Sequence, residues 1–183
     1  MGRLMLIFLM VVAFFLITLT GCISSPQVNP SLKIIETEEG SIFHPLENAI
    51  GALESDDGMR LARLPIYTIH TIIGENVTKE GDAKTWILAV KAEKPFYFIY
   101  SGGGFTTMDW HENNPGHAIN LNKIILPSEL LSQNPQRINS LYSGRSSGIR
   151  ELELNNGKYH IRGFSDGIEW QYTYDAVTGK EIS

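Results

Sequence analysis

The chain has 183 residues, 43% of them hydrophobic, and carries 15 Lys and Arg against 20 Asp and Glu, a net charge of −5. Because the basic residues form no cluster, the sequence lacks the electrostatic footprint of a nucleic-acid-binding protein. The single cysteine, Cys22, excludes an internal disulfide, and the length suits one domain or two small ones.

The N-terminal region has the pattern of a secretory signal. Arg3 precedes an apolar run from Leu4 to Leu19, and small residues follow the run. This run falls just short of the ~20 residues that usually span a bilayer. We therefore expect a cleaved signal rather than an uncleaved membrane anchor.

The end of this segment, Leu19-Thr20-Gly21-Cys22, resembles the lipobox of bacterial and archaeal lipoproteins. The resemblance implies that residues 1–21 are removed and that Cys22 is lipidated and becomes the first mature residue. Two or three acyl chains on one residue hold a protein firmly at a membrane. Residues 22–32 are rich in Ser, Pro and Asn and predict a flexible tether on the extracytoplasmic side.

Residues 33–120 predict a first α+β unit. Apolar residues at helical spacing follow Pro45, which suits the first position of a helix, and the Asp-Asp-Gly at 56–58 supplies a stop. Runs rich in β-branched and aromatic residues then predict strands, and Gly74-Glu75-Asn76 is expected to break the first of them. The predicted helical face is Leu46, Ala49, Ile50 and Leu53, and the predicted strands are 66–73, 86–91 and 96–100.

Residues 121–183 predict a second α+β unit with the same order. Helices are expected to begin at Pro127 and Pro135. Asn156-Gly157 between alternating runs is a strong hairpin signal, and a second turn follows at 165–167. The last strand places Ile168, Trp170, Tyr172 and Tyr174 on one face. The fold class is therefore α+β, with two tandem helix-plus-antiparallel-sheet units and a meander that needs a helical cover.

The closing segment, in which Tyr174-Asp175-Ala176 leads into Thr178-Gly179, resembles the end of PepSY-type domains. Asp175 and Thr178 can hydrogen-bond the backbone of a tight turn, and Gly179 adopts φ > 0 easily. The resemblance covers about 126–183, and the first unit shares only its layout. It implies a protein-binding or peptidase-regulating module without catalytic residues.

Two motifs that suggest enzyme chemistry fail on their context. Gly144-Arg145-Ser146-Ser147-Gly148 matches G-x-S-x-G, but a nucleophile elbow needs a strand before the serine and a helix after it, and this order is reversed. The glycines 102–104 are followed by Phe105-Thr106-Thr107, without the lysine and helix of a phosphate-binding loop, which favours a wide turn. We therefore expect no enzyme, no catalytic residue and no cofactor.

The densest collection of metal-ligand residue types is Asp109–His117. Its histidines, His111 and His117, are separated by Pro115-Gly116, so no shared helical face brings them together. A connecting loop is the favoured interpretation, and a metal or small-ligand site in this loop is the alternative.

The remaining histidines and one sequon have simpler interpretations. His44 is expected to cap the helix that follows it, and His70 and His160 to be surface or rim residues on strands. Asn76-Val77-Thr78 is an N-glycosylation sequon whose use depends on the host.

Taken together, the sequence predicts a cell-surface lipoprotein held at the membrane through Cys22. Its function is expected to be non-enzymatic binding of a protein or peptide, with regulation of a peptidase as the specific version. A meander has exposed edges to which a peptide can add as an extra strand. The alternative is binding of a small ligand or a metal through the 109–117 loop.

Overall fold

The structure is a computed structural model that describes residues 42–55, 57, 66–110, 116–143 and 148–182. These residues belong to one compact unit, Glu39–Ser183. The predicted signal peptide (1–21) and tether (22–32) lie outside the described residues. No helix in the described ranges is long and apolar enough to cross a membrane.

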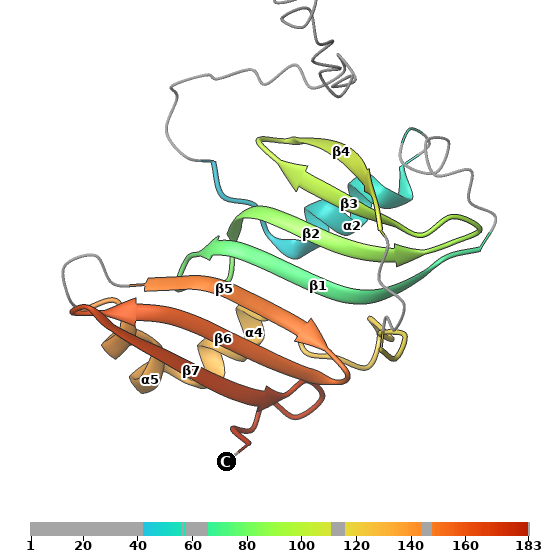
Figure 1. The fold of residues 1–183 in the computed structure, drawn as a ribbon. Helices are drawn as coiled ribbons and strands as arrows, with labels where there is room; N and C mark the ends of the chain where they lie inside the picture. Colours follow the sequence, from blue (N-terminus) through green and yellow to red (C-terminus); the bar gives the residue numbers. More distant parts are fainter. Residues whose placement is uncertain (1–41, 56, 58–65, 111–115, 144–147, 183) are drawn as a thin grey trace, which may run out of the picture. The chain divides into compact units, whose positions relative to one another are not determined.

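The described part of the chain is a mixed α/β fold with a seven-stranded antiparallel sheet and three helices (Figure 1). In chain order the elements are α2 (Leu46–Glu54), β1 (Thr68–Val77), β2 (Ala83–Lys91), β3 (Phe96–Ser101), β4 (Gly104–Asp109), α4 (Pro127–Gln133), α5 (Pro135–Leu141), β5 (Gly148–Asn155), β6 (Lys158–Ser165) and β7 (Ile168–Asp175).

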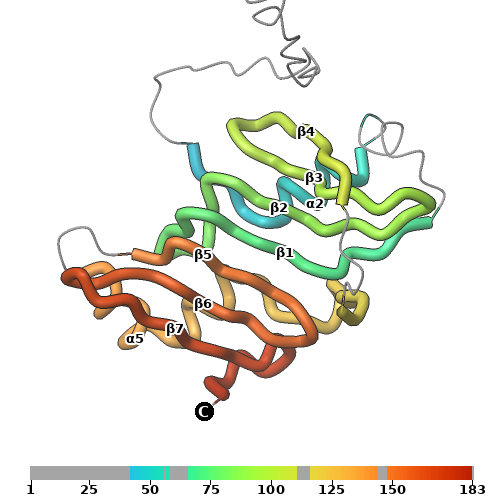
Figure 2. The backbone as a smooth tube through the Cα atoms, viewed as in Figure 1, coloured from blue at the N-terminus to red at the C-terminus, as the bar shows by residue number. Residues whose placement is uncertain are grey.

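The sheet runs without interruption across both predicted units. Its order is β4-β3-β2-β1-β5-β6-β7, so the two halves join where β1 pairs with β5 (Figure 2). This pairing is antiparallel and extends from Thr71↔Asn155 to Val77↔Ile149. Each half shows helix before strands, as the sequence suggested, while the boundary at 120/121 and the PepSY-like character of the halves stay predictions.

One hydrophobic core lies between the helices and one face of the sheet. Helix α2 contacts β2 and β3, and α5 contacts β6. Trp86 of β2 is fully buried, and its indole Nε1 donates a hydrogen bond to the His44 carbonyl at 2.8 Å. Because burial of large apolar side chains drives folding, this shared core makes both halves depend on each other.

The second half follows its sequence signals closely. Pro127 and Pro135 open α4 and α5, where the missing N–H costs nothing. Asn156 and Gly157, with φ of 45° and 73°, connect β5 to β6, and Asp166-Gly167 repeats the pattern before β7. Positive φ at both positions is the requirement of a type I′ hairpin turn. The predicted meander is confirmed.

The helical cover predicted for the apolar face of the last strand extends over only part of that strand. Tyr174 is fully buried, and Trp170 and Tyr172 pack against the core while half-buried. Ile168, at the start of β7, is 70% exposed. Helical cover therefore reaches the second half of the strand and leaves its beginning in solvent.

Several sequence predictions in the first half are wrong. Pro45 is the N-cap of α2 rather than its first residue. Gly74-Glu75-Asn76 does not break β1, which continues to Val77 because both neighbouring strands pair with it there. Gly104 is not part of a wide turn but begins β4, since Gly102 and Gly103 form a tight turn and Ser101 pairs with Gly104.

Two histidine predictions are also wrong. His44 does not cap α2, because its backbone forms a β-bridge with Ala83 instead. His70 is not a surface residue: only 7% of it is exposed, and it lies where the β1–β2 register shifts between Ile69 and Thr71. An irregularity of this kind re-aims a side chain, which alternation along the sequence does not reveal.

Gly74 offers a direct test of the packing at the centre of the sheet. A Cβ at this position would lie 2.6 Å from Cζ3 of Trp86. We expect Gly74→Ala to lower the free energy of unfolding by about 1–3 kcal/mol, because an overpacked core must shift. Urea denaturation followed by tryptophan fluorescence measures this change.

Gly51→Ala in α2 is the matched control, because nothing lies within 4 Å of the place that its added methyl group would occupy. It should raise stability by roughly 0.5–1 kcal/mol through helix propensity. Equal unfolding midpoints for Gly74→Ala and the wild type would contradict the packing described for Trp86.

Candidate functional site

Of the predicted site residues, the structure describes His117 and Asn76. Cys22 and His111 lie outside the described residues. His117 is exposed, and Asn76 is exposed at the end of β1 with φ of 51°. Within the described ranges, no three His, Cys, Asp or Glu side chains gather in a group that could hold a metal ion. The metal-binding alternative and the glycosylation of Asn76 stay predictions.

The described ends of the 109–117 segment are tied to the sheet. The Gly116 carbonyl lies 3.1 Å from Nδ1 of His70, so this nitrogen carries the proton and donates. The His117 backbone N–H donates to Oδ1 of Asn156 at 3.0 Å. These contacts join the segment to β1 and to the β5–β6 turn.

The sheet has two edge strands, β4 and β7, which differ in how much of their outer side is paired. On the outer side of β7, the last residues of the chain fold back and pair with Thr173 to Asp175. The Ile182 N–H donates to the Thr173 carbonyl at 2.8 Å, and the Asp175 N–H donates to the Lys180 carbonyl at 2.9 Å. This pairing closes the C-terminal half of the β7 edge.

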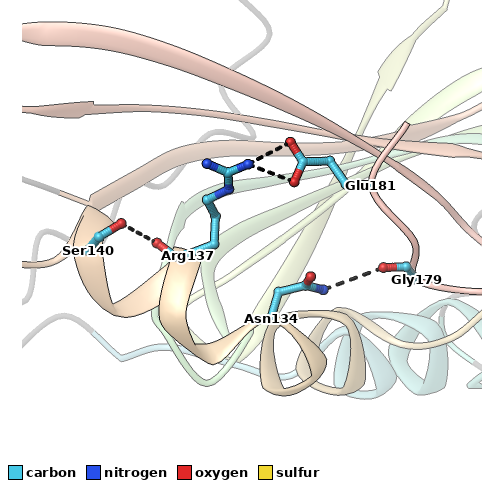
Figure 3. A network of polar contacts seen from close by, with 5 residues as sticks. All are labelled: Asn134, Arg137, Ser140, Gly179 and Glu181. Atoms are coloured by element: carbon cyan, nitrogen blue, oxygen red, sulfur yellow. Dashed lines mark hydrogen bonds and ion pairs between the residues drawn. The ribbon is translucent and has the colours of Figure 1, made fainter. Parts of the chain in front are cut away.

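Side chains of α5 and of Asn134, the residue between α4 and α5, fix this closing segment in place (Figure 3). The Arg137 guanidinium donates to both carboxylate oxygens of Glu181, at 3.1 and 3.0 Å, and lies 4.7 Å from the Tyr172 ring centroid. The Asn134 side-chain amide donates to the Gly179 carbonyl at 3.4 Å. The Ser140 hydroxyl donates to the Arg137 carbonyl one turn earlier at 2.6 Å.

The turn that leads into this segment is organised by Asp175. One of its carboxylate oxygens, Oδ1, accepts hydrogen bonds from the Thr178 hydroxyl and N–H, both at 2.8 Å, and from the Val177 N–H at 3.1 Å. The hydrogen bond from the Thr178 side chain is the main cause that holds the pKa of Asp175 below its usual value. Asp175 and Thr178 thus act as the sequence predicted.

The β4 edge, in contrast, is open within the described part of the chain. No described residue pairs with its outer side. Thr106, Thr107, Met108 and Asp109 are all exposed, Met108 by 55%. The strand contains no Lys, no Pro and no bulge, the devices with which proteins usually block an edge.

This open edge is held firmly by its inner neighbours. β4 pairs with β3 in an unbroken register from Phe96↔Asp109 to Ser101↔Gly104. The Phe105 ring stacks on the buried Phe98 ring with centroids 4.9 Å apart. Beyond the strand, the buried Trp110 packs against Tyr97 at 5.8 Å, and its backbone N–H donates to the Pro95 carbonyl. The unpaired backbone groups of β4 are therefore presented in a fixed geometry.

The sheet face that points away from the helices is apolar near β4 and charged toward β7. Near β4 it carries a row of half-buried isoleucines in register, Ile73↔Ile87↔Ile99, which ends at Thr106. Toward β7 the same face is charged. There Arg162 lies between Glu151 and Glu153, with nitrogen–oxygen distances of 3.2 and 2.7 Å. The open edge thus borders the apolar half of this face.

Strand β4 was not predicted from the sequence, because the glycines 102–104 were interpreted as a wide turn. The signal was nevertheless present. Two of these glycines form a two-residue connection, and the runs on either side, Phe96–Ser101 and Gly104–Asp109, contain the aromatic and β-branched residues typical of strands.

No protein-family model matches the sequence. No curated protein gives a significant match. Among solved structures, the fold is similar to the crystal structure of a "putative lipoprotein" from Clostridium difficile 630, with a TM-score of 0.51 and 14% sequence identity. The match covers 79% of this chain and 94% of that chain. At this identity the similarity establishes a shared fold.

Asp175 provides a test by pH. Because its pKa is lower in the folded chain than in the unfolded chain, its stabilisation is present above the unfolded pKa of about 3.9 and is lost as the pH falls through the folded pKa. We expect Asp175→Asn to be less stable than the wild type at pH 7, with the difference shrinking on acidification below pH 4. Urea midpoints at pH 7, 5 and 3 measure this.

Asp166→Asn is the control, since Asn accepts the positive φ of 50° at this turn position. It removes a carboxylate without removing a turn hydrogen bond described above. A pH-independent difference between Asp175→Asn and the wild type would show that the carboxylate charge is not what organises the turn.

Proposed function

We propose that this protein is a non-enzymatic, lipid-anchored module on the extracytoplasmic side of the cell membrane. In this proposal it binds an extended segment of a partner protein, which adds as an eighth strand beside β4. The observation that carries the proposal is the open, rigid β4 edge, set against a β7 edge that the chain itself partly closes.

Two observations support the lipid anchor. The sequence ends its signal-like segment with Leu19-Thr20-Gly21-Cys22, and Cys22 is the single cysteine of the chain. A protein of the same fold is described as a "putative lipoprotein". Dual acylation at one residue is sufficient for stable attachment.

Strand addition draws its affinity from main-chain hydrogen bonds and its specificity from alternate side chains. An added peptide would place one set of side chains beside Thr106 and the exposed Met108, above the apolar half of the open face. The other set would lie beside Phe105 and Thr107. Asp109, the charged residue of the strand, favours a basic residue opposite the end of β4.

The PepSY resemblance of 126–183 favours a peptidase as the partner. A module that binds an extended segment of a peptidase could hold that segment in place or keep it away from the catalytic cleft. This specific version is separate from strand addition itself, because any protein with an extended, unpaired segment could bind to β4 in the same way.

The anchor is tested by Cys22→Ser. We expect the variant to incorporate no labelled fatty acid and to leave the membrane fraction or to stay unprocessed, because the lipid has no attachment point. Its compact unit should unfold at the same urea concentration as that of the wild type. If the variant stayed in the membrane fraction at the mature mass of the wild type, the lipid anchor would be wrong.

Strand addition is tested by Thr106→Pro and Thr107→Pro. In an antiparallel pair, each residue directs its N–H and C=O to the same side, so one of these two residues faces β3 and the other faces outward. Proline at the outward residue removes a donor to an added peptide and leaves the β3–β4 ladder intact. Unfolding curves identify that variant, because it should keep nearly wild-type stability.

Partner binding is read out by a photo-crosslinking amino acid at position 108 in intact cells. We expect an adduct with one extended segment of a partner, reduced at least about tenfold by the outward-facing proline. The same crosslinker at Gln171, exposed on β7, should not capture that segment. Equal adduct yields with and without the outward proline would reject strand addition at β4.

A further inference from the structure

A concave surface lies at the end of the β1–β5 pair where Val77 pairs with Ile149. This hollow, of about 480 Å³, is within the size range of small-molecule sites. It is called the Arg150 pocket below. The residues that line it come from the segment before α2, the end of β1 and the turn after it, the end of α5, and the beginning of β5 and end of β6: Phe43, Asn76, Val77, Thr78, Lys79, Glu80, Tyr142, Gly148, Ile149, Arg150 and Phe164.

The wall of the pocket is largely apolar and is fixed by Tyr142. The Tyr142 hydroxyl donates to the Val77 carbonyl at 2.5 Å and accepts from the Ile149 N–H at 3.4 Å, so it bridges β1 and β5. Gly148 passes close to the ring, where a Cβ would lie 3.2 Å from Cε1 of Tyr142. Phe43, 39% exposed, contributes an aromatic surface in solvent.

The pocket lining includes an exposed cation, Arg150, that has no carboxylate partner in the described part of the chain. Arg150 sits at the register shift between Ile149 and Glu151, and its guanidinium lies 4.2 Å from the centroid of the Phe164 ring. Arg137 and Arg162, in contrast, each form ion pairs with glutamates. Stacking on a ring leaves the N–H edge of a guanidinium available for a carboxylate or phosphate.

Of the other polar side chains in the lining, Lys79 and Asn76 can donate hydrogen bonds to an anionic head group, whereas Glu80 is itself a carboxylate. Lys79 adds a second cation, and its only carboxylate neighbour among the described residues, Glu80, is 3.8 Å away in an exposed pair. An exposed ion pair of this kind contributes little to stability, so Glu80 competes only weakly with a ligand for Lys79. The Asn76 side chain, with its amide donor, lies in the same lining.

We propose that the Arg150 pocket binds an acyl chain with an anionic head group. The chain would lie against Phe43, Val77 and Ile149, and the carboxylate or phosphate would accept hydrogen bonds from Arg150. A free fatty acid and an anionic membrane phospholipid share this chemistry. The proposal is independent of strand addition at β4, because the two surfaces share no residue.

The position of Phe43 agrees with a membrane-derived ligand. It lies near the start of the compact unit, 21 positions after Cys22 in the sequence. A lipid anchor at Cys22 would therefore keep this end of the unit within a short tether of the bilayer, where acyl amphiphiles are concentrated.

The test uses the full lipidated protein on neutral phosphatidylcholine vesicles. Two probes carry the same photoreactive acyl chain: a twelve-carbon fatty acid and a phosphatidylglycerol. We expect irradiation to place adducts on peptides that contain Phe43, Ile149 or Phe164, located by mass spectrometry. Labelling by the fatty acid, by the phospholipid or by both supports the proposal and identifies the source of the ligand.

Arg150→Gln should reduce this labelling at least about tenfold, because it removes a charge-assisted contact and keeps most of the side-chain length. Lys84→Gln, which removes an exposed cation of β2 outside the pocket, should leave labelling unchanged. Excess dodecanoate should displace the probe and dodecanol should not. Equal labelling of Arg150→Gln and the wild type, equal displacement by dodecanol, or adducts confined to other peptides would overturn the proposal.

Discussion

The pairing of β1 with β5 is the constraint on which the rest of the structure depends. Without it, each half would have a sheet with one apolar side and two open edges. With it, a single row of side chains on the helix-covered face crosses all seven strands, in the register Phe105↔Tyr100↔Trp86↔Gly74↔Leu152↔Ile161↔Tyr172. Gly74 lies at the centre of this row, where the absence of a side chain makes room for Trp86.

This pairing also decides where the two proposed binding surfaces lie. It buries one edge from each half and leaves β4 and β7 as the two edges of the sheet. The C-terminal residues close part of the β7 edge, and Arg137 and Glu181 hold them there. Within the described part of the chain, the outer side of β4 keeps an unpaired backbone, which is why we propose that it binds a peptide. At the end of the β1–β5 pair where Val77 and Ile149 meet, Tyr142 bridges the two strands and shapes the Arg150 pocket.

Membrane anchoring and strand addition complement each other energetically. A short added strand contributes few hydrogen bonds, and each contributes only about 0.5–1.5 kcal/mol net. Two proteins held at one membrane meet at a high effective concentration, so a weak contact of this kind becomes sufficient. The proposed anchor at Cys22 and the short β4 edge therefore suit each other.

Local signals made the second half of the fold predictable. Pro127, Pro135 and Asn156-Gly157 act through their own backbone geometry, so the sequence alone locates two helices and a hairpin. The features that the sequence did not predict depend on packing between segments that are far apart in the chain. The continuation of β1 past Gly74 depends on Trp86 and on β5, more than 70 residues later in the chain.

The candidate sites also depend on contacts between distant parts of the chain, which local sequence signals do not reveal. The sequence predicted strand addition at an edge of the C-terminal meander, but β1 pairs with the β5 edge of this meander and residues 180–182 pair with part of its β7 edge. The edge that is open among the described residues, β4, was hidden behind its glycines. The Arg150 pocket combines segments from Phe43 to Phe164 and has no local motif. The burial of His70 depends on a register shift, which leaves no mark in the sequence pattern.

The most direct test of the account is amide hydrogen exchange, residue by residue, in the full protein without a partner. If β4 is an open edge, its amides should alternate from Phe105 to Asp109: those that face β3 protected, and those that face outward exchanging quickly. On β7, the Asp175 amide should be protected, because it donates to the Lys180 carbonyl. Uniform protection of the β4 amides would show that another part of the chain already covers this edge, and it would contradict the assignment of peptide binding to β4.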